Sequence, residues 1–99
     1  MKSAVDIQCL PLGVSDKEEI YDLVDKAIEV IKEAGHEYTV SAFSTTIEGE
    51  LEEIWPTALK AHLAVQEASG DNVISYIKLA TGPGLGTTEE KLERQKRRK

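Results

Sequence analysis

The stretch YTVSAFSTTIEGELEEIW, residues 38–55, decides the fold of this chain. Its first residues predict a strand over Tyr38–Ala42, and Thr45–Gly49 predicts a second strand. Only Phe43-Ser44 lies between the two strands, and so short a connection predicts a hairpin. The acidic residues that follow the second strand suit the positive end of a helix dipole. We therefore expect a helix to begin directly after the hairpin.

The residues before this stretch predict a strand and a helix. Residues 3–10 alternate, which gives the strand one apolar face made of Val5, Ile7 and Cys9. Ser15 and Glu18 have the spacing of a capping box, in which each side chain accepts from the other residue's backbone N–H. Gly35 is a typical helix stop. Between these signals an apolar stripe keeps helical spacing and is assigned to the core: Ile20, Leu23, Val24, Ala27, Ile28, Ile31 and Ala34.

The residues after the hairpin predict a helix over 51–69 and a fourth strand over 73–80. Pro56 conflicts with the helix, because proline is comfortable only in the first turn. We therefore expect the regular helix to begin nearer Ile54, or to bend. The glycine-rich residues 82–86 are interpreted as a flexible exit from the last strand. A phosphate-binding loop is the weaker alternative, because the lysine and hydroxyl spacing of a P-loop is missing. Thr87 or Thr88 then caps a short C-terminal helix.

The element order β-α-β-β-α-β predicts the α+β class and a ferredoxin-like sandwich. Two helices should cover one face of a four-stranded antiparallel sheet. We expect a single domain over residues 1–99, in which about 87–99 form a C-terminal helix or tail. The other sheet face should stay bare and expose Leu10, Ile74 and Tyr76 beside polar residues. Because exposed apolar residues often mark an interface, we expect a homo-oligomer.

Charge is distributed unevenly along the chain. Residues 1–88 hold 6 Lys and Arg against 15 Asp and Glu, whereas residues 89–99 hold 6 against 3. The acidic body argues against a nucleic-acid partner. The basic end, residues 96–99, is interpreted as a solvated helix end, with a docking patch as the alternative. No apolar run is long enough to cross a bilayer, and the N-terminus lacks a signal-peptide pattern, so we expect no membrane partner and a cytoplasmic location.

We expect no metal site and no catalysis. The acidic run of Glu48, Glu50, Glu52 and Glu53 is interpreted as a solvated helix start, with a site for a cationic ligand or a metal ion as the alternative. Cys9 is the only cysteine, and it lies far in sequence from His36 and His62, so that no metal-ligand spacing arises. We interpret Cys9 as a small buried residue, His36 as a loop residue and His62 as a helix residue. A nucleophile beside a base cannot be assembled. An acylphosphatase would need an arginine within residues 11–17, and a metal chaperone would need a second cysteine. We expect a protein that is not an enzyme.

Polar side chains gather on the predicted strand Thr45–Gly49. Thr46 and Glu48 share one face of this strand, and Thr45 lies on the other. The hydroxyls can donate to and accept from a heteroaromatic ring, Glu48 can pair with a cation, and Trp55 offers a stacking surface. Chemistry alone favours the alternative that the threonines merely suit a strand and that Trp55 belongs to the core. Thr45 and Glu48 can share a pocket only if the strand twists or bulges, or if another subunit contributes.

The segment STTIEGELEEI, residues 44–54, resembles the signature of the thiamine-binding protein family, whose relatives include YkoF-type domains. That family shows a threonine, two strand residues and then Glu-Gly before the second helix, which are here Thr45 and Glu48-Gly49. Pro11-Leu12-Gly13 and Ile77-Lys78 also match, and the resemblance covers roughly residues 3–95. Many members carry an Asp and an Arg after the Ile-Lys pair, whereas this chain has Leu79-Ala80-Thr81-Gly82.

The resemblance implies a ferredoxin-like fold, assembly into dimers or tetramers, and binding of thiamine or its hydroxymethylpyrimidine moiety for sensing, storage or delivery. It implies no catalysis and no cofactor beyond that ligand. Thr45 and Glu48 are the ligand-binding residues that it implies, and Thr46 and Trp55 are added from their chemistry. Thr45→Val or Glu48→Gln should then weaken binding. The alternative is a regulatory or interaction module of the same fold that binds another small molecule, such as an amino acid.

Overall fold

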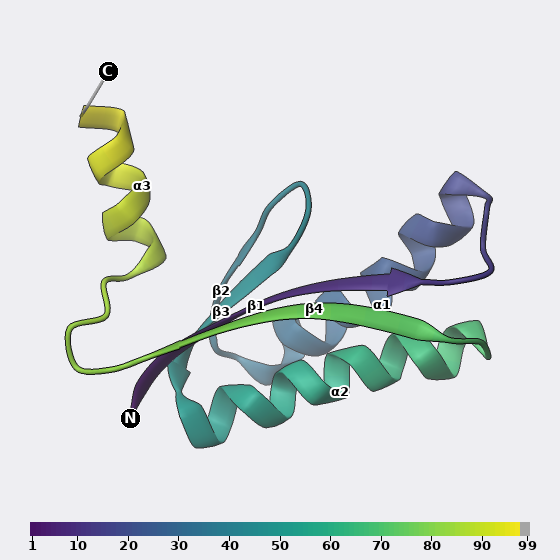
Figure 1. The fold of residues 1–99 in the computed structure, drawn as a ribbon, viewed down its shortest axis with the longest axis horizontal. Helices are drawn as coiled ribbons and strands as arrows, with labels where there is room; N and C mark the ends of the chain where they lie inside the picture. The colour runs from purple at the N-terminus through teal and green to yellow at the C-terminus, as the bar shows by residue number, and fades with distance from the viewer. Residues whose placement is uncertain (98–99) are drawn as a thin grey trace.

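The structure, a computed structural model, describes residues 1–97 (Figure 1). Its elements are β1 (Lys2–Pro11), α1 (Lys17–Ala34), β2 (Glu37–Val40), β3 (Thr45–Glu50), α2 (Leu51–Ser69), β4 (Val73–Thr81) and α3 (Thr88–Arg97). The four strands form one antiparallel sheet in the order β2-β3-β1-β4. This topology confirms the predicted ferredoxin-like α+β fold. The basic end that the sequence predicts, residues 96–99, includes residues 98–99, which lie outside the described residues.

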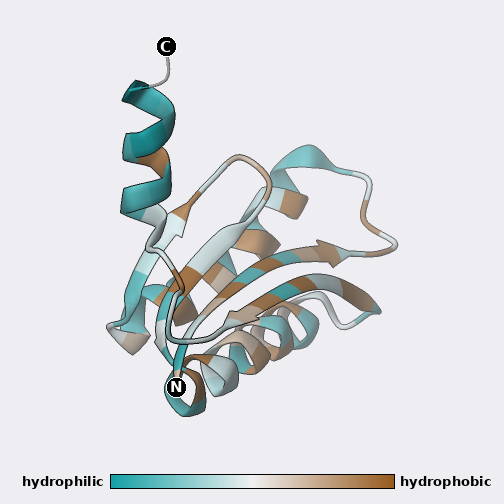
Figure 2. Cartoon of the chain, turned by 60° about the vertical axis from the view of Figure 1, so that its left-hand side comes forward, coloured by the Kyte–Doolittle hydropathy of each residue, from teal (hydrophilic) through white to brown (hydrophobic). Residues whose placement is uncertain are grey.

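The pairing register divides the sheet into a helix-covered face and an open face. β1 is a central strand, and its Val5, Ile7 and Cys9 are each at most 6% exposed beneath the helices. Residues directly opposite each other share a face, so Asp6 lies on the open face with Thr46 of β3 and Lys78 of β4. Figure 2 shows the resulting alternation of hydrophobic and hydrophilic bands along the strands. The predicted alternation of residues 3–10 is confirmed.

The core lies between the sheet and the two long helices. Its buried members are Val5, Ile7, Cys9, Leu23, Ala27, Ile31, Ile47, Ile54, Ala58, Ala61 and Val65. The α1 members recur every four residues, which places them on one side of that helix. Burying a Val, Leu or Ile side chain fully stabilises a fold by about 1.5–3 kcal/mol. These side chains therefore hold α1 and α2 against β1 and β3.

The caps of α1 differ in part from the prediction. The N-cap is Asp16, whose Oδ2 accepts from the backbone N–H of Glu19 at 3.1 Å. The predicted capping box of Ser15 and Glu18 is therefore wrong by one position, because the Asp16 carboxylate takes the N-cap role one residue later. Gly35 ends the helix in the left-handed conformation with φ of 80°, as predicted.

Two other boundaries also differ from the sequence prediction. α2 begins at Leu51 and continues through Pro56, so the expected start nearer Ile54 is wrong. Proline at this position removes one backbone donor, and the rest of the helix outweighs that loss through its buried row. β2 ends at Val40 rather than Ala42, because residues 41–44 form the hairpin turn. A hydrogen bond of 2.8 Å from the Ser41 N–H to the Ser44 carbonyl closes that turn.

The open face exposes large apolar side chains, as predicted. Ile74 and Tyr76 are 45% and 61% exposed, while Leu10 is partly covered. Figure 1 shows α3 projecting away from the sheet and the other two helices. Among residues 1–97, no helix has both the length and the apolar character needed to span a membrane.

Candidate functional site

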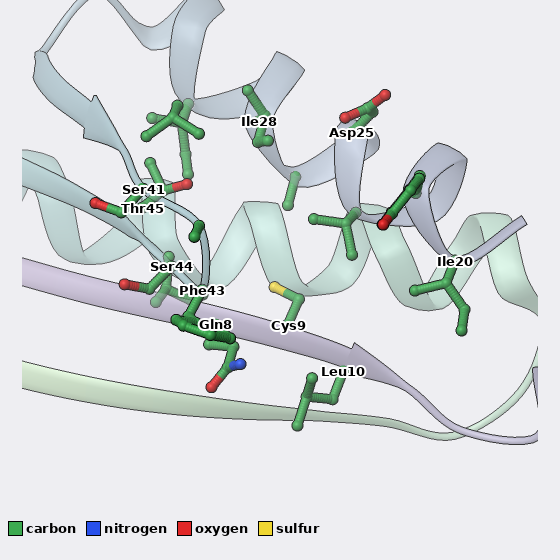
Figure 3. A pocket seen from close by; sticks show the side chains of 17 residues that line it. Gln8, Cys9, Leu10, Ile20, Asp25, Ile28, Ser41, Phe43, Ser44 and Thr45 are labelled. Atoms are coloured by element: carbon green, nitrogen blue, oxygen red, sulfur yellow. The ribbon is translucent and has the colours of Figure 1, made fainter. Parts of the chain in front are cut away.

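A cleft of about 260 Å³ lies between α1, the end of β1 and the hairpin turn (Figure 3). We call it the α1–hairpin cleft. The residues that line it are Ile7–Leu10, Ile20, Tyr21, Val24, Asp25, Ala27, Ile28, Ile31 and Val40–Thr45. Small-molecule sites commonly span about 300–1,000 Å³. The volume of this cleft therefore suits a ligand of one or two small rings.

The cleft exists because β1 is longer than its neighbour β3. The pairing of β3 with β1 stops at the Thr45–Ile7 pair, whereas β1 continues to Pro11 beside β4. Residues 8–10 of β1 therefore have no strand beside them on the hairpin side. Backbone N–H and C=O groups at an unpaired strand edge are strong donors and acceptors. The facing wall is the turn of residues 41–44, which leaves space for a ligand to use that edge.

The floor of the cleft is the second apolar row of α1. The first row, made of Leu23, Ala27 and Ile31, is buried in the core. The second row, made of Ile20, Val24 and Ile28, is only partly buried and lines the cleft. The sequence analysis assigned the whole stripe to the core. The structure divides it, because the hairpin leaves this side of α1 uncovered.

Two exposed aromatic rings flank the cleft. Tyr21 of α1 is 53% exposed, and Phe43 in the hairpin turn is 81% exposed. Lys17 Nζ lies 5.8 Å from the centroid of the Tyr21 ring, which shows that this ring can accept a cation. Asp25 is the only carboxylate among the lining residues, and none of them is lysine or arginine. The cleft therefore suits a neutral or cationic aromatic ligand better than an anion.

Thr45 is the one predicted site residue that lines this cleft. It is the first residue of β3 and is 5% exposed, with its side chain on the helix-covered face. Figure 3 shows Thr45 beside Ser41 and Ser44 at the hairpin end of the cleft. Three hydroxyls thus stand at one end of an apolar slot, where each can donate or accept a hydrogen bond.

Thr46 and Glu48 lie on the opposite, open face. Thr46 lines a hollow of about 450 Å³ beside α3, and its Oγ1 donates to Asp6 Oδ1 at 2.9 Å. Glu48 Oε1 accepts from the backbone N–H of Thr88 at 2.6 Å, where α3 begins. In this position the carboxylate satisfies a free donor at a helix N-terminus. The structure thus separates Thr46 and Glu48 from Thr45 by the thickness of the sheet.

Trp55 lies in a third place. It is 43% exposed on α2, so its interpretation as a core residue is wrong. The ring borders a groove of about 230 Å³ between α2 and β4, which we call the α2–β4 groove. The groove is also lined by Ala58, Leu59, His62, Ser75 and Ile77. Trp55 therefore does not face Thr45, Thr46 or Glu48, and Tyr21 and Phe43 are the aromatic residues beside Thr45.

A hydrogen-bonded chain crosses the core from this groove to the α1–hairpin cleft. His62 Nδ1 lies 2.5 Å from Ser75 Oγ, and Ser75 Oγ donates to Cys9 Sγ at 3.4 Å. The sequence showed no such serine–histidine pair. Which of His62 Nδ1 and Ser75 Oγ donates to the other depends on the tautomer of His62. Burial raises the pKa of the Cys9 thiol, and the smaller effect of the Ser75 hydrogen bond lowers it.

His36 and His62 lie where the sequence predicted. His36 follows the C-cap of α1 in a loop, and its Nε2 is 3.0 Å from Thr57 Oγ1 of α2. His62 belongs to α2. Within the part of the chain that the structure describes, no three His, Cys, Asp or Glu side chains gather closely enough to hold a metal ion.

Three residues of the cleft were missed by the sequence analysis: Tyr21, Asp25 and Phe43. Phe43 carried the clearest signal, because a large aromatic residue at a hairpin turn is neither a turn former nor part of the core. Tyr21 and Asp25 lie beside the second apolar row of α1. Their role depends on how far the hairpin covers that row, which periodicity does not reveal.

The fold and the cleft define a small ferredoxin-like domain with a ligand-sized slot beside its hairpin. A family model described as "Thiamine-binding protein" matches residues 5–96. The chain belongs to this family, as the resemblance of residues 44–54 predicted.

Relatives and solved structures agree with this assignment. The UPF0045 protein CPE1503 of Clostridium perfringens is 34% identical over 89% of this chain and 90% of its own length. The hypothetical protein MJ1052 of Methanocaldococcus jannascii has a TM-score of 0.82 and 30% identity, with 96% of both chains covered. A proposed thiamine biosynthesis or salvage protein of Thermotoga maritima has a TM-score of 0.81 and 26% identity, over 96% of this chain and 99% of that one.

Proposed function

We propose that this protein binds thiamine, or its hydroxymethylpyrimidine moiety, in the α1–hairpin cleft and does no chemistry on it. Membership of the thiamine-binding family supports the class of ligand. The observation that carries the proposal is the lining of the cleft, which combines an apolar floor, two flanking aromatic rings and one carboxylate with no basic side chain. A heteroaromatic cation matches each of these features.

The aminopyrimidine ring would occupy the hairpin end of the cleft. Its ring nitrogens and exocyclic amine need both donors and acceptors, which the Thr45 hydroxyl and the free edge of residues 8–10 supply. Phe43 would stack on the ring. The positively charged thiazolium would lie toward Asp25. This arrangement assigns the complementary charge to Asp25 in place of Glu48, which is bound to α3 on the other face.

Non-catalytic binding suits sensing, storage or delivery of the vitamin, and we propose that the protein acts in the cytoplasm. Self-association into dimers or tetramers is part of the same proposal. Its support is the open sheet face, where Ile74 and Tyr76 remain exposed. Burial raises the pKa of the Cys9 thiol, which favours its unreactive protonated form and supports the absence of a thiolate nucleophile.

Isothermal titration calorimetry tests the proposal. Thiamine and hydroxymethylpyrimidine should each release or absorb heat on binding, and Thr45→Val should weaken both by roughly fivefold, because one hydrogen bond contributes about 1 kcal/mol. Thr46→Val is the matched control, since the neighbouring hydroxyl lies on the open face, and it should leave affinity unchanged. An absence of heat with both ligands at millimolar concentration, together with a thermal shift by an amino acid instead, would support a module for another small molecule.

A further inference from the structure

The hollow beside α3 is a second place where a small molecule fits. Its volume of about 450 Å³ lies within the range of small-molecule sites, about 300–1,000 Å³. One wall is the open sheet face, and the other wall is α3. The sheet supplies Ala4, Asp6, Thr46, Lys78, Leu79 and Ala80, and α3 supplies Thr88, Lys91 and Leu92. None of these residues lines the α1–hairpin cleft, so the two sites are separate.

Charges of both signs line the hollow without an ion-pair partner. Asp6 and Lys78 lie directly opposite each other on β1 and β4. In the described part of the chain, however, the only ion pair joins the Met1 amino group to Glu50. On α3, no carboxylate lies three or four residues from Lys91, which is the spacing at which helix side chains pair. One carboxylate and two ammonium groups therefore remain available to a ligand.

The carboxylate of Asp6 is oriented by a neighbouring strand. Thr46 Oγ1 donates to Asp6 Oδ1 at 2.9 Å. A carboxylate has room for several hydrogen bonds, so Asp6 can still accept from an ammonium group. Glu48 lies opposite Ala4 on the same face, but its Oε1 already accepts from the Thr88 N–H where α3 begins. Asp6 is therefore the carboxylate that the cationic end of a ligand meets.

The remaining walls of the hollow are largely apolar. Leu79 of β4 is 49% exposed and Leu92 of α3 is 54% exposed, so a ligand between them covers apolar surface on both walls. Leu92 is also the only apolar residue of α3. Figure 2 shows a single hydrophobic band on this otherwise hydrophilic helix. The hollow therefore combines both charges with space for an apolar group.

We propose that the hollow beside α3 binds a free α-amino acid with an apolar side chain. The ammonium group of the amino acid lies at Asp6, and its carboxylate lies between Lys78 and Lys91. Its side chain packs between Leu79 and Leu92. A simple anion leaves the Asp6 carboxylate as a repelling charge, and a simple cation meets two ammonium groups. A zwitterion satisfies both signs of charge.

Calorimetry with a matched series of ligands tests the site. Leucine should bind at millimolar concentration or below. 4-Methylpentanoate lacks the amine and leucinamide lacks the carboxylate, and each should bind about twofold to fivefold more weakly, the range expected of exposed ion pairs. Glycine keeps both charges without the side chain and should bind about tenfold more weakly. No heat with leucine at millimolar concentration, or equal affinities for glycine and leucine, would overturn the proposal.

Charge variants show which end of the amino acid each residue contacts. Asp6→Asn keeps an acceptor oxygen for Thr46 and should weaken leucine about twofold to fivefold, while the affinity for 4-methylpentanoate should not fall. Lys91→Ala should weaken leucine by a similar factor and leave leucinamide unchanged. Asp22→Asn on α1 and Lys60→Ala on α2 are the matched controls, because both residues are exposed outside the hollow, and they should keep the wild-type affinity. An equal loss of leucine and 4-methylpentanoate binding in Asp6→Asn would contradict the contact with the amine.

Hydrogen exchange and competition locate the bound amino acid. α3 has no buried residue, so a ligand that contacts both walls should slow amide exchange across Thr88–Arg97. Leucine and thiamine should bind independently, because their sites share no residue. The calorimetry with leucine contains no thiamine, so failure of the proposed thiamine site would not alter it. Unchanged exchange across α3 at saturating leucine, or displacement of leucine by thiamine, would place the amino acid elsewhere and overturn the proposal.

Discussion

Thr45 and Glu48, three positions apart on β3, point to opposite faces of the sheet. Thr45 lines the α1–hairpin cleft on the helix-covered face, where it is 5% exposed. Glu48 lies on the open face and accepts from the Thr88 N–H at 2.6 Å. A ligand in the cleft can touch Thr45 and cannot touch Glu48 of the same chain. The two residues that the family signature grouped together therefore lie in separate places in one subunit.

The charge of Asp25 should distinguish thiamine from its neutral fragment. Asp25→Asn removes the only carboxylate of the cleft and should weaken thiamine binding about twofold to fivefold, the range expected of an exposed ion pair. Hydroxymethylpyrimidine carries no permanent charge, so its affinity should not change. Calorimetry with both ligands on one preparation checks this difference. Equal weakening of both ligands would contradict an electrostatic role.

Phe43 should contribute to binding through its ring. Phe43→Ala removes the exposed aromatic side chain at the hairpin turn and should weaken either ligand by about threefold to tenfold, since an aromatic contact is worth roughly 0.5–1.5 kcal/mol. Trp55→Ala is the matched control, because Trp55 lies in the α2–β4 groove, outside the cleft. If Trp55→Ala weakened ligand binding more than Phe43→Ala while its oligomeric mass in solution stayed unchanged, the ligand site would lie in the α2–β4 groove instead.

Glu48 should hold the start of α3 in place. Glu48→Ala removes the acceptor of the Thr88 N–H, and loss of such a contact at a helix start costs about 0.5–2 kcal/mol. We expect faster hydrogen exchange across α3 and unchanged ligand affinity. Glu48→Gln keeps an acceptor oxygen and should show an intermediate effect. Weaker ligand binding by Glu48→Gln would instead support the role in the ligand site that the family resemblance implied.

Cys9 should make stability depend on pH in the alkaline range. Burial raises its pKa above the ordinary value of 9.0, so the folded state holds the thiol proton more tightly than the unfolded state. This stabilisation is complete below about pH 9 and is lost as pH rises from the unfolded pKa through the folded one. Urea midpoints at neutral and alkaline pH should fall less steeply for Cys9→Ala than for the wild type. Parallel slopes for the two proteins would contradict the buried environment of the thiol.

The fold was predictable from local signals, because each element carries its own periodicity. The alternation around Val5 and Ile7 defines β1, and the four-residue spacing of Leu23 and Ala27 defines one side of α1. The errors lie at boundaries. Asp16 and Ser15 are both good caps, so the sequence could not decide between them. Pro56 opposes the helix locally, and only the packed row of α2 explains why the helix continues.

The site was predictable only in part. Strand alternation correctly placed Thr45 and Glu48 on opposite faces, but sequence could not show that the pairing of β3 stops at Thr45 and so opens the cleft. Asp25 and Phe43 line that opening although one belongs to α1 and the other to the hairpin turn. Trp55 looked close to the threonines in sequence, yet the start of α2 carries it to the β4 edge. Each of these placements depends on tertiary packing.

The position of the bound ligand tests the central claim most directly. A crystal structure of the protein with thiamine should show the aminopyrimidine in the α1–hairpin cleft, within hydrogen-bond distance of Thr45 Oγ1 and against the ring of Phe43. Ligand density in the hollow beside α3, in contact with Thr46 and Glu48 and with the α1–hairpin cleft empty, would contradict the account.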